Sequence, residues 1–134
     1  MTPVVTYEIE QQLVQDILIT FGAVPYMRLW RTNTGKAYGA GVVMAAIKSG
    51  SVELLKHQRP VTFNTPGTAD ICGIISAPPN RGRWIAIEAK MEGEKPSEDQ
   101  VMWRAMIESR GGIYVLAYSV DDVRLGLHAA GVLP

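Results

Sequence analysis

The sequence lacks the features that mark several common classes of protein. It contains one cysteine, Cys72, so an intrachain disulfide and a cysteine metal cluster are both excluded. We expect that thiol to be buried as a small apolar residue within a strand. No glycine-rich phosphate loop and no obvious nucleophile is present. The apolar segment 42–47 is too short for a membrane span, and no signal peptide is recognisable. We therefore expect a cytoplasmic protein that contacts no membrane.

An excess of basic charge is also missing, since 13 Lys and Arg residues balance 13 Asp and Glu residues. Proteins that bind nucleic acids usually carry a basic surface, so the net charge does not favour that class. Two considerations reduce this objection. A bound cation would neutralise carboxylates in a metal site, and the basic residues are clustered locally. The clusters are Arg28, Arg31 and Lys36; Lys48, Lys56, His57 and Arg59; and Arg81 and Arg83.

Length and residue order predict one α/β domain over residues 1–134. The chain is 47% hydrophobic and 19% charged, which is an ordinary globular balance. The expected order is a helix, a strand, an irregular segment, a hairpin, a helix, a strand and a helix. This order is typical of a mixed sheet. Apolar residues on both faces of the hairpin strands predict that helices flank the sheet on both sides.

The hairpin is the most informative part of the sequence. Two apolar runs of strand-forming residues, 67–71 with its continuation to 75 and 84–90, flank turn residues at 77–82. If the hairpin is symmetric about Pro79, Asp70 and Glu88 lie opposite each other and point to the same face. Lys90 shares that face because side chains alternate along a strand.

Two carboxylates beside an amine suit a hard divalent cation such as Mg²⁺ or Mn²⁺. The lysine could orient water or stabilise charge on a phosphate. The same three residues, Asp70, Glu88 and Lys90, could equally form an ordinary solvated strand end. The local pattern leaves both interpretations open.

Four motifs of the wider chain resemble the virus-type replication-repair nuclease (VRR-NUC) domain of the PD-(D/E)xK nuclease superfamily. They are Gly67-Thr68-Ala69-Asp70, Glu88-Ala89-Lys90, Ser97-Glu98-Asp99-Gln100 and Gly112-Ile113-Tyr114-Val115. The resemblance extends from the first helix to about Asp122 and is weakest over 36–66. Ala69 stands where the superfamily often has proline, which is not a ligand.

The resemblance implies a restriction-endonuclease-like core and a phage-like DNA-repair enzyme. It implies that Asp70, Glu88 and the backbone carbonyl of Ala89 hold Mg²⁺ or Mn²⁺, with Lys90 acting on the attacking water. The pattern Arg31-x-Asn33-x-Gly35 lies near the substrate side in that family. We therefore expect substrate contacts from Arg31 and Asn33, joined by basic residues of the less readable segment. These are Lys36, Lys56 and Arg59.

The first helix is expected over residues 7–21, with Thr6 as its N-cap and Gly22 ending it. Glu10 falls on the apolar stripe of this helix, whereas Glu8 does not. By the resemblance, Glu10 reaches the metal site, possibly through water as in the family. Alternatively, Glu10 is a first-turn acid favoured by the helix dipole.

A second helix begins after Ser97, and its Gln100 has two interpretations. Ser97-x-x-Gln100 is a capping box, in which the glutamine bonds back to the cap amide. By the resemblance, the same glutamine helps to organise the active site. Trp103 shares its stripe, and we expect Trp103, Met102 and Met106 to lie in the core rather than to stack on bases.

The segment 36–66 is either a substrate-facing flap or a variable insertion. Within it we expect a helical turn or strand at 42–47, a short helix at 51–57 and a strand at 60–64. The apolar residues 42–47, or the tail 125–133, could form a homodimer contact, and we expect a homodimer because a two-fold junction needs two sites.

The expected function is therefore metal-dependent hydrolysis of DNA phosphodiester bonds, with branched or flapped DNA as the substrate. The alternative is a catalytically inactive module that binds nucleic acid or protein on the same fold.

Overall fold

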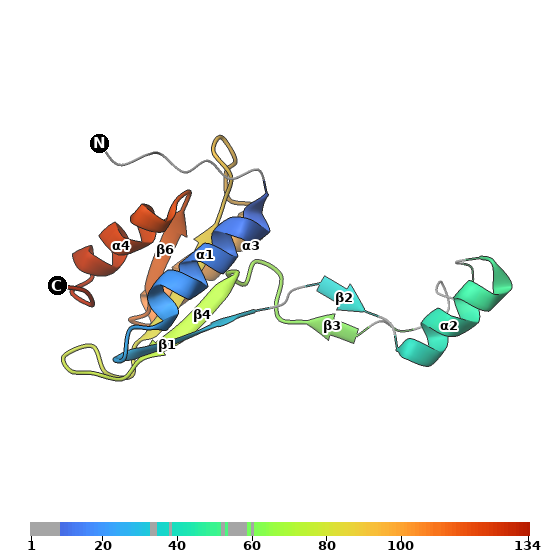
Figure 1. Ribbon diagram of the computed structural model, residues 1–134, viewed down its shortest axis with the longest axis horizontal. Coiled ribbons are helices and arrows are strands. Elements are labelled where there is room, and N and C mark those ends of the chain that lie inside the picture. The colour runs from blue at the N-terminus through green and yellow to red at the C-terminus, as the bar shows by residue number, and fades with distance from the viewer. Residues whose placement is uncertain (1–8, 33–34, 38, 52, 54–58, 60) are drawn as a thin grey trace. The chain divides into compact units, whose positions relative to one another are not determined.

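A four-stranded mixed sheet forms the centre of the larger of two units (Figure 1). Its strands are β1 (Met27–Arg31), β4 (Ile71–Ile75), β5 (Trp84–Ala89) and β6 (Ile113–Ala117), in that spatial order. The β5–β6 pair is parallel, and the other pairs are antiparallel. The predicted α/β class with a mixed sheet is confirmed.

The structure is a computed structural model that describes residues 9–32, 35–37, 39–51, 53, 59 and 61–134. For 35–37 and 61–63 it describes the backbone alone. The larger unit comprises residues 1–32 and 67–134, and the smaller unit comprises residues 33–66. The expectation of one domain over the whole chain stays a prediction. No helix among the described residues is long and apolar enough to cross a membrane.

Helices cover both faces of the sheet, as the two-sided apolar pattern predicted. α1 (Glu10–Gly22) and α4 (Val120–Ala129) pack on one face, where Ile85 and Ile87 join the main core. Figure 1 shows α1 lying across the near side of the sheet. α3 (Glu98–Ser109) packs on the other face.

α3 contacts the sheet through a narrow stripe of side chains. Its inward stripe, Trp103 and Ile107, packs with Ala86 and Tyr114. The indole of Trp103 meets the Tyr114 ring edge-on, with centroids 6.2 Å apart. Trp103 is therefore a packing residue, as predicted.

The prediction that Met102 and Met106 lie in the core is wrong. Met102 is 70% exposed, and Met106 is also exposed. Residues four apart share a helix face, and these two occupy the face of α3 that is turned away from the sheet.

The first helix begins later than predicted. Ile9 is the N-cap residue and has an extended backbone, so α1 starts at Glu10 rather than at Tyr7. The Ile9 side chain makes no capping hydrogen bond. Thr6, which we expected as the cap, lies outside the described residues, as does Glu8. The predicted buried stripe is correct, since Leu13, Val14 and Ile17 are all buried.

In its described residues, the smaller unit contains an antiparallel pair of strands, β2 (Gly35–Ala37) and β3 (Val61–Phe63), and the helix α2 (Ala40–Ser49). The segment 42–47 is thus helical, and the strand expected at 60–64 is present. Most of the short helix expected at 51–57 lies outside the described residues. The choice between a substrate flap and a variable insertion stays open.

Candidate metal centre

Three carboxylates from separate elements converge beside the sheet. Glu10 is the first residue of α1, Asp70 directly precedes β4, and Glu88 lies near the end of β5. One carboxylate oxygen from each lies within 4.8 Å of the others. Glu10 is therefore both a first-turn acid and a member of the cluster, so its two interpretations are compatible.

The hairpin register accounts for the position of Asp70 and Glu88. Ile71 pairs with Ile87 and Ile74 with Trp84, so the hairpin is symmetric about Pro79, as predicted. One step beyond the Ile71–Ile87 pair, the same register brings Asp70 to Glu88. The symmetric register of the hairpin thus places the two acidic residues opposite each other.

Backbone hydrogen bonds hold Asp70 in place. Its Oδ2 accepts a hydrogen bond from the backbone N–H of Ala89 at 2.9 Å. Its carbonyl accepts one from the N–H of Thr32 at 2.8 Å, and the Thr32 hydroxyl donates to the carbonyl of Ala69. Thr32 was not predicted as a positioning residue. The signal available was a hydroxyl at the end of a strand that neighbours the acidic turn.

Glu88 is the buried member of the cluster, with 2% of its surface exposed. Its Oε1 accepts a hydrogen bond from Gln100, whereas its Oε2 is buried without a hydrogen-bond partner. A buried polar atom without a partner costs about 1–3 kcal/mol, and more when the group is charged. Such an atom needs a proton or a cation.

The pKa of Glu88 is raised from 4.5 to about 8, first by burial and then by the nearby Asp70 carboxylate, whereas Lys90 acts to lower it. The pKa of Glu10 is also raised, first by burial and then by Asp70, and Lys90 again acts in the opposite direction. Without a cation, burial and the neighbouring negative charge therefore oppose the ionisation of Glu88 and Glu10.

Gln100 completes the predicted capping box and also contacts the acidic cluster, whereas its role in an active site stays a prediction. Its Oε1 accepts from the Ser97 N–H at 2.9 Å, and the Ser97 hydroxyl accepts from the Gln100 N–H at 3.2 Å, which completes the capping box. Its Nε2 donates to Glu88 Oε1 at 2.8 Å. The two ends of one amide thus join the start of α3 to the acidic cluster.

The turn at Gly67 lies against the same helix start. Its φ is +88°, in the left-handed region, and a Cβ there would lie 2.2 Å from the carbonyl oxygen of Asp99. Only glycine fits at this position. The segment that leads to Asp70 therefore packs against the first turn of α3, which contains Gln100.

Lys90 directly follows β5, and its N–H donates to the carbonyl of Ala117 at 2.9 Å. Its ammonium lowers the pKa of both Glu10 and Glu88, so its charge acts on the cluster. The metal-binding role expected for the Ala89 carbonyl stays a prediction. The observed contact of Ala89 is the N–H donated to Asp70.

The residues expected to contact substrate are only partly described by the structure. Arg31 is exposed at the end of β1, and Arg59 is exposed in the smaller unit. Asn33 and Lys56 lie outside the described residues, and Lys36 is described by its backbone only. Their roles stay predictions.

Cys72 is buried and free, as expected, and burial raises its pKa to about 11. A thiol with so high a pKa is a poor nucleophile at neutral pH. Burial also raises the pKa of Tyr114, with Glu88 adding to the effect. Neither group is a candidate for nucleophilic chemistry.

The residues of the centre fit a hard divalent cation. The donors are carboxylate oxygens, which Mg²⁺ and Mn²⁺ prefer, and the unpartnered Oε2 of Glu88 is a ready ligand atom. Histidine and cysteine take no part in the cluster of described residues, so nothing in its composition favours zinc.

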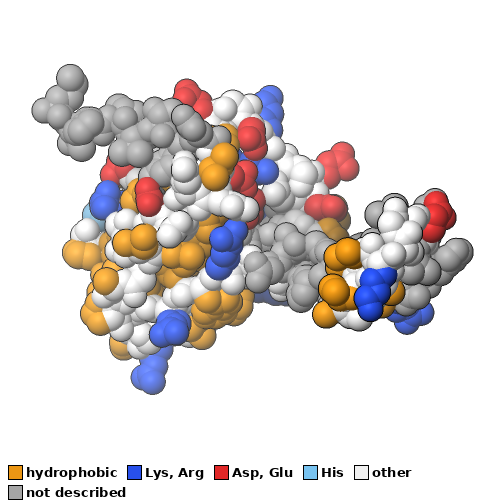
Figure 2. All heavy atoms as spheres, turned by 45° about the vertical axis from the view of Figure 1, so that its right-hand side comes forward, with side chains coloured by type: hydrophobic (Ala, Val, Ile, Leu, Met, Phe, Trp, Pro, Cys, Tyr) orange, Lys and Arg blue, Asp and Glu red, His pale blue; other side chains and the backbone are white. Residues whose placement is uncertain are grey.

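The charges on the surface agree with the zero net charge. On the face drawn in Figure 2, most acidic side chains of the larger unit lie in its upper part, and Lys and Arg side chains are scattered singly. The part of this face that is described forms no continuous basic patch.

A scan against protein-family models and a search of curated proteins found no match to this chain.

Proposed function

We propose that this protein is a Mg²⁺- or Mn²⁺-dependent endonuclease that hydrolyses DNA phosphodiester bonds, as its resemblance to VRR-NUC domains implies. One observation supports this most strongly. Asp70, Glu88 and Glu10 bring carboxylate oxygens within 4.8 Å, and one of the Glu88 oxygens is buried without a partner. A structural acid on a strand end would instead have its oxygens hydrogen-bonded or in water.

Asp70, Glu88 and Glu10 would hold the cation, with the Ala89 carbonyl as a further proposed ligand. When bound, Mg²⁺ or Mn²⁺ supplies positive charge at the scissile phosphate and acidity to a water nucleophile. Lys90 orients that water or stabilises the charge that develops on the phosphate. Gln100 fixes one oxygen of Glu88, and the other is buried without a hydrogen-bond partner.

The assignment is tested with labelled branched, flapped and linear DNA in Mg²⁺, Mn²⁺ or EDTA. We expect cleavage with either metal and none in EDTA. Asp70→Ala and Glu88→Ala should abolish cleavage and weaken Mn²⁺ binding in calorimetry, while circular dichroism shows folded proteins. Unchanged Mn²⁺ affinity in both variants would contradict the site. Equal cutting of linear and branched DNA would remove only the preference for branched substrates.

The second candidate is a catalytically inactive module that binds nucleic acid or protein. Such a module would have no need to retain the complete set of Asp70, Glu88 and Lys90, which this chain does. Binding of DNA without any cleavage under the metal conditions above would favour it.

We also propose a homodimer that acts in the cytoplasm, or in the host cytoplasm if the protein is phage-encoded. Of the two contact segments expected, the tail packs on its own core through Leu127 and Val132. α2 instead exposes Val43, Met44 and Ile47, so it is the better contact. Light scattering should return twice the chain mass of 14.7 kDa. Met44→Glu should convert the dimer to a monomer, and a monomeric wild type would contradict this part.

A further inference from the structure

An apolar and aromatic surface lies beside the metal centre on the sheet face that carries α3. We call it the tryptophan platform and define it as Trp30, Ile74 and Trp84. These residues are 39%, 41% and 37% exposed. The rings of the two tryptophans meet edge-on, with centroids 5.5 Å apart. Exposed apolar clusters of this kind mark binding surfaces.

The register of the sheet orders this face in rows. Arg28 pairs with Ile74, and Ile74 pairs with Trp84, so these three residues form one row across β1, β4 and β5. Trp30 lies in the next row, opposite Cys72. The platform is open because α3 packs over the β5–β6 side of this face.

The following row on the same face is the acidic one. Trp84 and Glu88 are four residues apart on β5 and point to the same side, which corresponds to about 13 Å along the strand. Trp30 lies closer still, since Thr32, two residues further along, donates its N–H to the Asp70 carbonyl. A ligand lying on the platform would therefore extend directly to the metal centre.

Two arginines give the platform a positive border. Arg28 is exposed, and its side chain makes no hydrogen bond or ion pair within the described part of the chain. Arg110 lines a cleft of about 610 Å³ together with Trp84, and its guanidinium donates to the Met106 carbonyl and the Ser109 hydroxyl rather than to a carboxylate. By contrast, Arg104 and Arg124 are paired with carboxylates.

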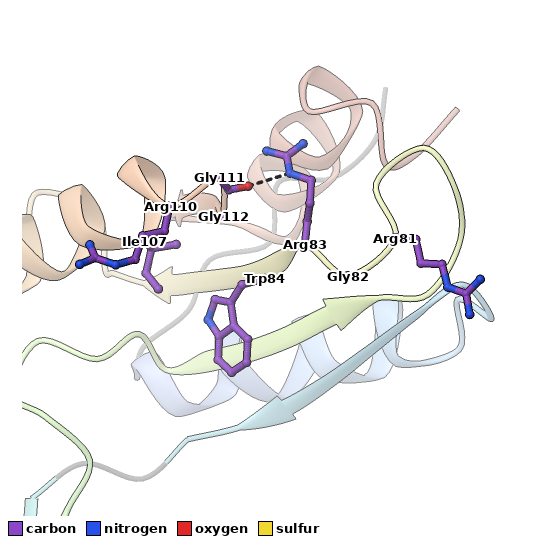
Figure 3. A pocket seen from close by; sticks show the side chains of 8 residues that line it. All are labelled: Arg81, Gly82, Arg83, Trp84, Ile107, Arg110, Gly111 and Gly112. Carbon is purple, nitrogen blue, oxygen red and sulfur yellow. Dashed lines mark hydrogen bonds between the residues drawn. The ribbon is translucent and has the colours of Figure 1, made fainter.

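The other arginines at this cleft are less available. Figure 3 shows Arg83 turned to the opposite side of the strand from the Trp84 ring and bonded to the Gly111 carbonyl at 2.8 Å. Arg81 points away from the cleft in the same view. The unpaired charge beside the platform thus comes from Arg28 and Arg110.

We propose that the tryptophan platform holds a single-stranded nucleic-acid segment, such as the flap or arm of a branched substrate. Exposed indoles stack on bases, and unpaired arginines contact phosphates, so both parts of the ligand find a partner. A duplex hides its base faces, which is why a single strand fits better. This inference rests on the proposed nuclease function, because it supplies the substrate that the metal centre cuts.

The test measures binding of a fluorescent oligothymidylate and of a blunt duplex to the full chain in EDTA, where no cleavage occurs. Trp30→Ala and Trp84→Ala should each weaken single-strand binding about tenfold and leave duplex binding nearly unchanged. Trp84→Phe should recover most of the loss, which separates stacking from folding. Arg28→Gln and Arg110→Gln should each reduce the salt slope of single-strand binding by a little under one.

Leu125→Ala and Arg124→Gln are the controls, because both change exposed residues of α4 on the other side of the sheet. They should bind like the wild type. No binding of oligothymidylate, unchanged binding in both tryptophan variants, or equal losses for duplex would overturn the platform. A changed oligomeric state with unchanged DNA binding would overturn it too, since the surface would then contact protein. Platform-dependent binding without metal-dependent cleavage would leave the platform standing and remove only the nuclease proposal.

Discussion

The Nε2 of Gln100 donates a hydrogen bond to Oε1 of Glu88 at 2.8 Å. The same side chain accepts from the Ser97 N–H, so the cap of α3 and the acidic centre share one amide. A glutamine is required for this arrangement because it has both an acceptor and a donor at its end.

Gln100→Glu separates the two roles. Glutamate at this position preserves the capping box, since its carboxylate still accepts from the Ser97 N–H. It removes the donor to Glu88 and adds a like charge, so we expect cleavage to fall about 10²-fold, as for loss of one positioned polar group. Ser97→Ala is the matched control and should cost about 1 kcal/mol of stability with much less effect on cleavage. Full activity in Gln100→Glu would reduce the glutamine to a cap.

Lys90→Ala should separate metal binding from turnover. An ammonium is not a ligand, so calorimetry should show Mn²⁺ binding at least as tight as in the wild type. Turnover should fall by roughly 10²-fold or more, because a positioned catalytic group is lost. Lys95→Ala, a change in the loop that follows β5, is the control. Near-normal turnover of Lys90→Ala would make the lysine a bystander.

The raised pKa of Glu88 predicts how stability depends on pH in the metal-free protein. Its folded pKa of about 8 exceeds its ordinary value of 4.5, so the folded state retains a proton that the unfolded state releases. The contribution of protonated Glu88 to the free energy of unfolding is therefore fully present below about pH 4.5 and is lost as the pH rises through about 8.

Glu88→Gln should remove this dependence. The variant should match the wild type at low pH and exceed it above pH 8, by an amount on the order of a few kcal/mol. Urea unfolding in EDTA at several pH values measures the difference. Divalent metal should reverse the order by stabilising the wild type alone. A pH-independent difference between the two proteins would contradict the assignment.

Glu10→Gln tests the contribution of α1. The carboxylate lies within the cluster, so the neutral amide should weaken metal binding and impair cleavage. Glu8→Gln is the control that the helical pattern supplies, and it should be close to silent. If Glu8→Gln impaired cleavage and Glu10→Gln did not, the phase of the helix would be wrong.

The parts of the site that follow from local rules could be predicted from the sequence. Strand alternation and the symmetric turn place Asp70 beside Glu88, and the apolar stripe of the first helix contains Glu10. The cap signature at Ser97 is equally local. The two interpretations of Gln100 could not be resolved in advance, because a capping side chain has a second end whose contact depends on tertiary structure.

The remaining features depend on how the elements pack. Nothing in the pattern of α3 indicates that it covers only part of a sheet face, so the exposure of Trp30, Trp84 and Met102 was not predicted. Thr32 was missed for a similar reason, since its partner Ala69 is 37 residues away in sequence. The start of α1 at Glu10 could not be predicted from a capping signature, because Ile9 has no side chain that can cap a helix.

Gly67→Ala tests whether the backbone approach at the turn holds the centre together. A Cβ would lie 2.2 Å from the Asp99 carbonyl oxygen and 2.9 Å from the Gln100 nitrogen, both backbone atoms. The positive φ of +88° adds strain for any residue with a side chain. The turn and the start of α3 must therefore separate, which moves Asp70 relative to Gln100.

We expect this variant to lose more than 1 kcal/mol of stability, beyond the usual effect of alanine at a positive φ, and most of its Mn²⁺ affinity. Gly93→Ala is the matched control. Gly93 also has a positive φ, of +87°, but a Cβ there meets no atom within 4 Å. It should therefore show the conformational strain alone and keep its metal affinity. Equal effects of the two substitutions in urea unfolding and calorimetry would mean that the contact with α3 does not position the carboxylates.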